Sequence, residues 1–333
     1  MKRIELGSPA TLETLRLVER DPPRPKRGEV LVRVRASSLN FHDYLVAKGV
    51  LPTIAGRVPM SDGVGEILEA GEDTSTFRVG DRVLGTFFTD WIDGAPSEAM
   101  TARMRGDHVD GFASEYVALP ETDFTAAPAG LSDVEAATLP CAALTAWRAL
   151  MVEGNVKPGD VVLVEGSGGG SIFSVQFAKL AGATVIATTS SEAKAARLKA
   201  LGADHVINYV AMPKWGKAAR ELSGGKGVDD LIEVVGGDLV QALQACRVGG
   251  RICLVGALSR QPIQFPAMLA IRGNLRITGV TVGSRKHQQD MVRAIEARGL
   301  KPVVDRVFPL ANLRDAFLHQ EAQAHFGKIC ISL

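Results

Sequence analysis

The chain has 333 residues, a length typical of two domains. Apolar residues make up 46% and charged residues 23% of it, the balance of packed globular proteins, which excludes extensive disorder. The formal net charge is +1 and no basic stripe with interleaved aromatic residues is present, so nucleic acid is not expected as a partner.

The N-terminal segment has charges every few positions, and no window reaches the ~18 consecutive apolar residues of a membrane span. We therefore expect a cytoplasmic protein with no membrane partner. The cysteines are widely spaced without a C-x-x-C pair, and they are Cys141, Cys246, Cys253 and Cys330. This spacing predicts free thiols, which suit a reducing compartment.

Short β-rich runs separated by Gly, Pro and Asp turns occupy residues 25–120, among them EVLVRVRAS, GVGEILEAG and DRVLGTFF. This part of the chain predicts an irregular, barrel-like β domain.

From about residue 130 helices and strands alternate regularly. The expected strands are 161–165, 184–188, 204–207, 230–235, 251–256 and 275–281, and the expected helices are 133–151, 171–181, 192–201, 215–223 and 237–247. Short buried strands alternating with helices predict an α/β domain with a doubly wound parallel sheet. Helices at 286–298 and 311–321 and the terminal strand GKICISL follow, and periodicity alone assigns them to neither domain.

A glycine-rich loop, GSGGGS, joins the strand at 161–165 to a helix that begins at Ser171. Strand, tight turn and helix are the context of a dinucleotide-binding site, in which glycines let backbone amides approach the pyrophosphate. Ser171 takes the place of the third glycine of the G-x-G-x-x-G pattern. A glycine-rich turn of another α/β protein is the alternative, and the repeated alternation around the loop disfavours it.

The second strand of the alternation ends in Thr-Thr-Ser-Ser, residues 188–191, where an NAD site usually places a carboxylate. Hydroxyls accompanied by Lys194, with Arg197 as a second candidate, could bind a 2′-phosphate. The missing carboxylate therefore predicts NADP(H). Glu192 weakens this prediction, and the alternative is that both cations belong to a solvated helix face.

Several further segments strengthen the interpretation, among them LPCAALTAWRAL, VKPGDVVLVEGSGGGSIFSVQFAK, ALGADHVINY and HFGKICISL. Through these segments taken together, the chain resembles the medium-chain dehydrogenase/reductase superfamily, and most closely its zinc-free quinone oxidoreductase-like branch. The resemblance runs along essentially the whole chain. It implies a GroES-like β-rich catalytic domain over 1–122, a Rossmann NADP(H)-binding domain over 123–282, and a return to the catalytic domain over 283–333.

Zinc members of this superfamily hold the catalytic metal with two cysteines and a histidine. The resemblance places those ligands at Asn40, Ser61 and Cys141, only one of which is a metal-binding type. Zinc needs three protein ligands beside its open position, so we expect no metal and read Cys141 as a buried residue at a helix start.

Without a metal to hold the developing alkoxide, an isolated ketone is a poor hydride acceptor. A quinone or an α,β-unsaturated carbonyl delocalises the charge, so a few hydrogen-bond donors suffice. The resemblance and this chemistry together predict an NADPH-dependent reductase of conjugated carbonyls that acts on a small molecule.

The expected catalytic residues are Asn40, which the resemblance places beside the nicotinamide, His42 and Tyr44. His42 matches a proton-relay position, and with Asp43 it forms a candidate proton-delivery pair. The alternatives are a turn-capping role for Asn40 and a surface-loop histidine at 42. Tyr44 is a candidate donor to the carbonyl, although the related tyrosine falls one place later.

The remaining expected contacts come from the loop and from the resemblance. The expected cofactor contacts are Asn40, Thr145, Gly166, Gly168, Gly169, Gly170, Ser171, Ser190, Ser191, Lys194, Tyr209, Val235, Gly256, Ala257, Val282, Ser284 and Lys328. The expected substrate contacts are Tyr44, Phe88, Trp91 and Arg285. Phe88 and Trp91 could equally be core residues, Arg285 could cap a strand and Lys328 could be solvated.

Two other functions compete with this one. The first is a zinc-free alcohol dehydrogenase or ketone reductase, and the second is an NADPH-binding protein without enzymatic activity. The last strand of the alternation, in LRITGVTV, is apolar and expected at a sheet edge, which predicts a homodimer formed by edge pairing.

Overall fold

The computed structural model describes residues 1–333 as two compact units. Unit 1 comprises Met1–Leu144 and Val282–Leu333, and unit 2 comprises Thr145–Thr281. The strand Phe124–Ala126 pairs with Arg82–Gly85 of the N-terminal sheet, so the expected boundary between residues 122 and 123 lies inside unit 1. No helix in the chain combines the length and the apolar character that crossing a membrane would require.

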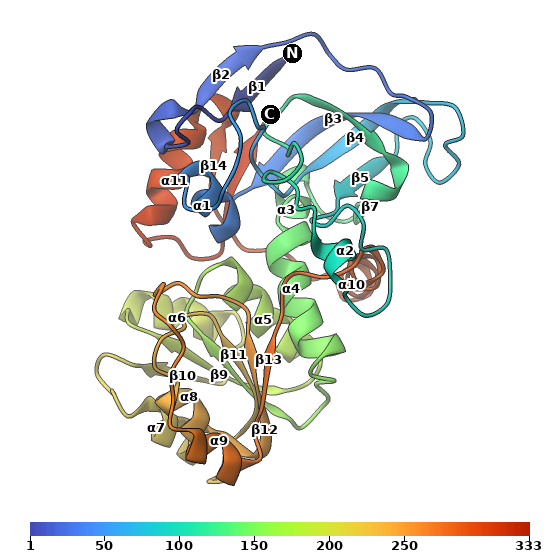
Figure 1. Cartoon of the computed structure of the whole chain (residues 1–333). Helices are drawn as coiled ribbons and strands as arrows, with labels where there is room; N and C mark the ends of the chain where they lie inside the picture. The colour runs from blue at the N-terminus through green and yellow to red at the C-terminus, as the bar shows by residue number, and fades with distance from the viewer. The chain divides into compact units, whose positions relative to one another are not determined.

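Unit 1 contains a mostly antiparallel sheet in the order β14-β15-β3-β4-β5-β7, with β6 also paired to β3, and a separate hairpin β1-β2. Its strands are β1 (Lys2–Glu5), β2 (Arg16–Glu19), β3 (Glu29–Ser38), β4 (Val64–Ala70), β5 (Arg82–Gly85), β6 (Tyr116–Pro120), β7 (Phe124–Ala126), β14 (Val304–Pro309) and β15 (Lys328–Ser332). The C-terminal strand β15 pairs with β3, so the two ends of the chain build one sheet (Figure 1).

Unit 1 also contains helices, which lie between its strands in the sequence. They are α1 (Phe41–Ala47), α2 (Glu98–Thr101), α3 (Asp133–Ala136), α10 (Arg285–Arg298) and α11 (Leu313–Glu321), with 3₁₀ turns at Leu12–Thr14, Glu121–Asp123 and Leu310–Asn312. Alternate β3 residues Val30, Val32 and Val34 are buried in one core cluster, as the period of two of a strand requires. The helix α1 follows β3 directly and carries three of the residues discussed below.

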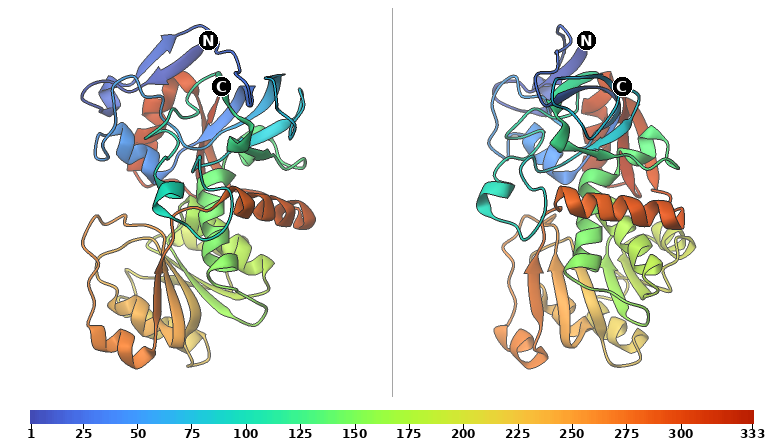
Figure 2. Two further views of the ribbon diagram at one scale, coloured as in Figure 1. Left: turned by 45° about the vertical axis from the view of Figure 1, so that its right-hand side comes forward. Right: turned by 90° about the vertical axis from the view of Figure 1, so that its right-hand side faces the viewer.

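Unit 2 is a six-stranded parallel sheet in the order β10-β9-β8-β11-β12-β13. Its strands are β8 (Val161–Glu165), β9 (Thr184–Thr189), β10 (His205–Asn208), β11 (Val228–Glu233), β12 (Cys246–Leu254) and β13 (Arg276–Gly279), and its helices are α4 (Leu144–Trp147, which begins in unit 1), α5 (Gly169–Leu180), α6 (Glu192–Ala200), α7 (Trp215–Leu222), α8 (Val240–Ala245) and α9 (Ala267–Gly273). Both views in Figure 2 show these strands side by side with helices beside them. This strand order is the doubly wound order, and the expected α/β fold class is confirmed.

Several elements differ from the sequence-based expectation, among them the helices α1 and α2, which were not predicted. The helix expected over 133–151 is broken into α3, α4 and two π-helical turns, Leu139–Ala143 and Arg148–Val152. Pro140 lies at the first break, and proline has no amide hydrogen for a continuous helix. The helix α9 and the strand β14 were not predicted.

Candidate active site

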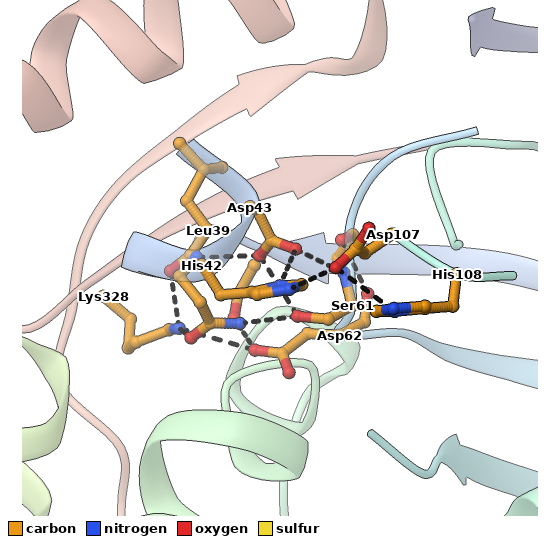
Figure 3. Close-up of polar contacts among 11 residues, drawn as sticks. Leu39, His42, Asp43, Ser61, Asp62, Asp107, His108 and Lys328 are labelled. Atoms are coloured by element: carbon orange, nitrogen blue, oxygen red, sulfur yellow. Dashed lines mark hydrogen bonds and ion pairs between the residues drawn. The ribbon is translucent and has the colours of Figure 1, made fainter. Parts of the chain in front are cut away.

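A cluster of buried polar side chains lies in unit 1 around the start of α1 (Figure 3). Asn40 precedes α1, and its backbone amide donates to Asp43 Oδ2 at 2.9 Å. The Asn40 side-chain amide donates to Ser61 Oγ at 3.2 Å, and Ser61 Oγ donates to Asp43 Oδ2 at 3.2 Å. Asn40 thus belongs both to the helix start and to a connected polar network.

Lys328, at the start of β15, places its ammonium inside this cluster. Nζ donates to Asn40 Oδ1 at 2.5 Å and to the Leu39 carbonyl at 2.6 Å, and it lies 3.4 Å from Asp62 Oδ2. The Lys328 residue is only 3% exposed, so the solvated alternative is wrong. A buried ammonium is stable only where such partners compensate for its lost hydration.

Asp62 provides the buried negative charge opposite Lys328. Its Oδ2 also accepts a hydrogen bond from Ser38 Oγ at 2.6 Å. Burial raises the pKa of Asp62, the Lys328 charge opposes this, and the Asp43 charge adds to it. Lys328 is therefore the cation that favours an ionised Asp62.

The three positions matched to zinc ligands do not fit a zinc ion. Asn40 and Ser61 offer an amide and a hydroxyl, and the Asn40 amide oxygen already accepts from Lys328. Burial raises the pKa of the Cys141 thiol well above its usual range, and the charge of Asp62 raises it further. Cys141 is thus the single zinc-type ligand of the three, whereas zinc needs three protein ligands. Cys141 is the third residue of the π-helical turn that begins at Leu139, so it lies at a helix start as expected, but the residue is half-buried and not fully buried.

His42 faces two carboxylates from α1. Its Nε2 lies 3.4 Å from Asp107 Oδ2, and its Nδ1 lies 3.8 Å from Asp43 Oδ1. Burial alone would lower the pKa of His42, but the hydrogen bonds and charges of Asp107 and Asp43 outweigh it and raise the pKa to about 9. The side chain is 16% exposed, so the surface-loop alternative is wrong.

Tyr44 lies outside the polar cluster. Its ring packs in the apolar core of unit 1, and its hydroxyl donates to Glu321 Oε1 at 2.8 Å, where Lys48 also binds. The hydroxyl is committed to α11, because the helix turns residue 44 away from the face that carries His42 and Asp43. The structure therefore does not bring the expected carbonyl donor to the cluster.

The expected substrate contacts are engaged in packing within unit 1. Phe88 and Trp91 are buried in a row of ring contacts that continues to His287. Arg285, at the start of α10, donates through Nε to the Phe124 carbonyl at 2.8 Å. The ring contacts correspond to the core alternative. Arg285 bonds the first residue of β7 and not the last strand of the parallel sheet, which the capping alternative named.

In unit 2 the glycine-rich loop has the geometry of a phosphate cradle. Gly166 follows β8 with φ +76°, a conformation that L side chains rarely adopt. Gly168 precedes α5, and Gly169 and Gly170 form its first turn, where backbone amides lack helical partners. Ser171 Oγ donates to the Glu165 carbonyl at 2.7 Å, which explains a serine in place of the third glycine.

The hydroxyl-rich end of β9 lies beside the end of β10. The backbone amide of Tyr209 donates to the Thr189 carbonyl at 3.1 Å, and the Tyr209 side chain is exposed. Ser191 precedes α6, and its Oγ accepts from the Lys194 backbone amide at 3.4 Å. The exposed Ser190 lies between them, so the chain brings the expected 2′-phosphate residues to one edge of the sheet.

Glu192, which weakened the NADP(H) prediction, is engaged elsewhere. Its Oε1 accepts from Asn208 Nδ2 at 2.7 Å. The carboxylate is thus bonded to the last residue of β10.

The other expected cofactor residues lie on several segments. In unit 2, Val235 and Ala257 are exposed after β11 and β12, Gly256 packs so tightly that an added Cβ would lie 2.7 Å from the Val234 carbonyl oxygen, and Thr145 lies in α4. In unit 1, Ser284 caps α10 by accepting from the His287 amide at 3.1 Å, and Val282 has φ +41°, an outlier for a β-branched residue. The capping contact gives Ser284 a structural role.

Two family models match the chain. The alcohol dehydrogenase GroES-like domain matches residues 26–129, and the zinc-binding dehydrogenase domain matches residues 171–297. A zinc-type alcohol dehydrogenase-like protein of Schizosaccharomyces pombe is 42% identical over 323 residues, covering 94% of this chain and 93% of the relative.

Solved structures resemble the chain over its full length. An NAD-dependent alcohol dehydrogenase has a TM-score of 0.91 at 34% identity, with 100% of both chains covered. A quinone oxidoreductase of Pseudomonas syringae has a TM-score of 0.84 at 26% identity, covering 100% of this chain and 99% of the other.

Proposed function

The chain belongs to the medium-chain dehydrogenase/reductase superfamily, an oxidoreductase family that binds a nicotinamide cofactor, and on this premise we propose a more specific function. We propose that the protein is a zinc-independent, NADPH-dependent reductase that adds hydride to a conjugated carbonyl, either a quinone or an α,β-unsaturated ketone or aldehyde. The cofactor supplies the hydride, and the protein supplies the binding groups and the proton.

One observation carries the proposal. Lys328 buries its ammonium against Asn40 and Asp62, in the cluster that includes two of the positions matched to zinc ligands. A fixed ammonium stabilises negative charge on a nearby oxygen by Coulomb attraction and hydrogen bonding, as a metal would, although less strongly. The cluster therefore favours an acceptor whose negative charge is already delocalised.

The same chemistry gives roles to the residues of the cluster. The ammonium of Lys328 acts on the acceptor oxygen through its charge, because its three hydrogens already have partners in Asn40, Leu39 and Asp62. The side-chain oxygen of Asn40 orients that ammonium. Asp62 orients the ammonium, because its Oδ2 lies 3.4 Å from Lys328 Nζ inside the protein. A conjugated carbonyl needs no stronger stabilisation of its developing negative charge than this ammonium provides.

The NADPH preference is supported by unit 2. Hydroxyls and Lys194 follow β9, and the nearby carboxylate of Glu192 is bonded to Asn208. A 2′-phosphate carries close to two negative charges, which hydroxyls and a lysine stabilise and a carboxylate would repel. The glycine-rich loop and the start of α5 suit the pyrophosphate of either dinucleotide.

The experiment that tests this function is a substrate and cofactor panel on the purified protein. We expect kcat/KM for benzoquinone and cyclohexenone to exceed that for cyclohexanone by at least about 100-fold. Reduction of cyclohexanone places the whole negative charge on one oxygen, and the lack of a group that stabilises such a charge costs about that factor in rate. NADPH should be preferred over NADH, and Lys194→Glu should remove the preference without changing NADH affinity.

The competing function, an alcohol dehydrogenase or ketone reductase, is favoured by the structural similarity to an NAD-dependent alcohol dehydrogenase. Faster turnover of cyclohexanone or its alcohol than of either conjugated acceptor would support this alternative. Equal use of NADH and NADPH, unchanged in Lys194→Glu, would contradict the cofactor part of the proposal.

A further inference from the structure

A row of ionisable side chains leads from the Asn40 cluster to the surface of unit 1 (Figure 3). His108 Nδ1 lies 3.3 Å from Asp107 Oδ2, and the same carboxylate oxygen lies 3.4 Å from His42 Nε2. The Asp107 side chain is 5% exposed, whereas that of His108 is 47% exposed. The row therefore has one end in solvent and the other in the protein interior.

The inner end of the row joins the polar cluster. His42 Nδ1 is fully buried without a hydrogen-bond partner and lies 3.8 Å from Asp43 Oδ1. The other oxygen of Asp43 accepts from Ser61 Oγ, which accepts in turn from the side-chain amide of Asn40. An imidazole with one nitrogen toward each of two carboxylates can take up a proton on one side and release it on the other.

Reduction of a conjugated carbonyl consumes a proton that must come from outside the site. Hydride from the cofactor forms a C–H bond at the β-carbon, the C=C electron pair shifts toward the carbonyl oxygen, and a proton then forms the C–H bond at the α-carbon. The cofactor is oxidised and the alkene is reduced, so each turnover uses one proton from solvent.

We propose that His108, Asp107 and His42 form a proton path from solvent to the Asp43–Ser61 pair, which resupplies the proton that each turnover consumes. This inference rests on the proposed function, because it assigns these residues a task only in a proton-consuming reaction. Asp107 and His108 act through His42 and are proton-transfer residues that do not contact the acceptor.

The environment of His42 supports this role. Asp43 on its own helix and Asp107 on the neighbouring loop are the charged groups that act on it, and the ring of Phe87 packs edge-on at 5.3 Å. These two carboxylates favour the protonated form of His42. The gaps of 3.3 to 3.8 Å are longer than ordinary hydrogen bonds, as is common before substrate binds.

The test uses the full-length protein with NADPH and cyclohexenone. Asp107→Asn should lower kcat about 100-fold, the size of a typical proton-transfer contribution, with KM for both substrates unchanged. The solvent isotope effect in D₂O should rise, and the isotope effect of deuterated NADPH should shrink, because proton supply becomes rate-limiting.

A second variant and a control guard against misfolding. His108→Gln alters only the exposed end, should show the same isotope pattern, and should be rescued by added imidazole. Asp90→Asn removes a carboxylate of the same region that pairs with Arg103, and it should leave every parameter unchanged.

The outcomes separate the two proposals. If wild-type protein reduces cyclohexenone or benzoquinone but Asp107→Asn and His108→Gln match it in kcat and in both isotope effects, the path is wrong and the proposed function stands. If wild-type protein reduces neither acceptor, the proposed function fails and the proton supply fails with it.

Discussion

Two buried glutamates meet in unit 2, at the ends of neighbouring parallel strands. Glu165 ends β8 and Glu233 ends β11. Glu233 Oε1 accepts from the amides of Val235 at 2.6 Å and Gly236 at 2.8 Å. Burial raises the pKa of Glu165 well above its usual range, and the charge of Glu233 and a hydrogen bond to it raise the pKa further. Burial beside Glu233 thus favours the protonated form of Glu165.

This pair predicts a pH-dependent stability. A carboxyl whose pKa is raised in the folded state contributes fully below its unfolded pKa of about 4.3, and the contribution is lost as pH rises through the folded pKa, with a slope of at most about 1.4 kcal/mol per pH unit. Glu165→Gln cannot ionise, so its free energy of unfolding relative to wild type should increase from pH 5 to pH 9. Urea unfolding of both proteins from pH 5 to pH 9 measures this difference in free energy.

The exposed Glu221→Gln is the matched control and should show no such trend. A constant difference between Glu165→Gln and wild type at all pH values would mean that Glu165 does not titrate in the folded state.

For single residues, the sequence predicted which side chains are candidates better than it predicted what each side chain contacts. Asn40 and His42 were predicted as candidates because the resemblance matched their positions to functional ones, and Asp43 because it follows His42 and could pair with it. Asp107 was missed because it lies on a loop that is distant from His42 in sequence, although the two side chains are close in space, and no spacing pattern signals such a contact. Tyr44 is only two residues from His42, but its place in α1 turns its hydroxyl to Glu321.

Among the elements, the turn between β8 and α5 depends most clearly on residue type. Gly166 has φ +76°, and an added Cβ would meet only ordinary contacts, with Ser171 Oγ at 3.5 Å and a Val234 methyl at 3.8 Å. The backbone conformation and not crowding therefore requires glycine. The strand and the helix were both predictable because their periodicity is strong, whereas the bond from Ser171 to the end of β8 was not.

Gly166→Ala should lower the free energy of unfolding by about 1 to 2 kcal/mol, the cost of an L residue in the left-handed region. It should also weaken NADPH binding, because strain in this turn displaces the amides at the start of α5. Thermal unfolding and a fluorescence titration with NADPH measure the two effects.

Gly170→Ala is the control for this turn, since nothing lies within 4 Å of its added Cβ and α5 gains a better helix former. It should be as stable as wild type or slightly more so. If Gly166→Ala and Gly170→Ala had the same free energy of unfolding, the positive φ of Gly166 would not be what the turn requires.

For the whole molecule, the chain order of the strands and the resemblance together predicted the α/β class and the return of the C-terminus to the first sheet. Periodicity alone could not place the last 50 residues, because β15 is defined by its pairing with β3 and not by its own pattern. The strand β13 is an edge of the six-stranded sheet, and the homodimer expected through it stays a prediction.

The most direct measurement for the central claim is the rate of cyclohexenone reduction by metal-stripped protein, wild type beside Lys328→Met. Wild type should keep its full rate without metal and gain nothing from added zinc. Lys328→Met should lose about 100-fold in kcat, because the cation acts on the developing charge, and it should melt at a lower temperature than wild type, because buried Asp62 loses its cationic partner. A rate that requires zinc, or a folded Lys328→Met variant as fast as wild type, would contradict the account.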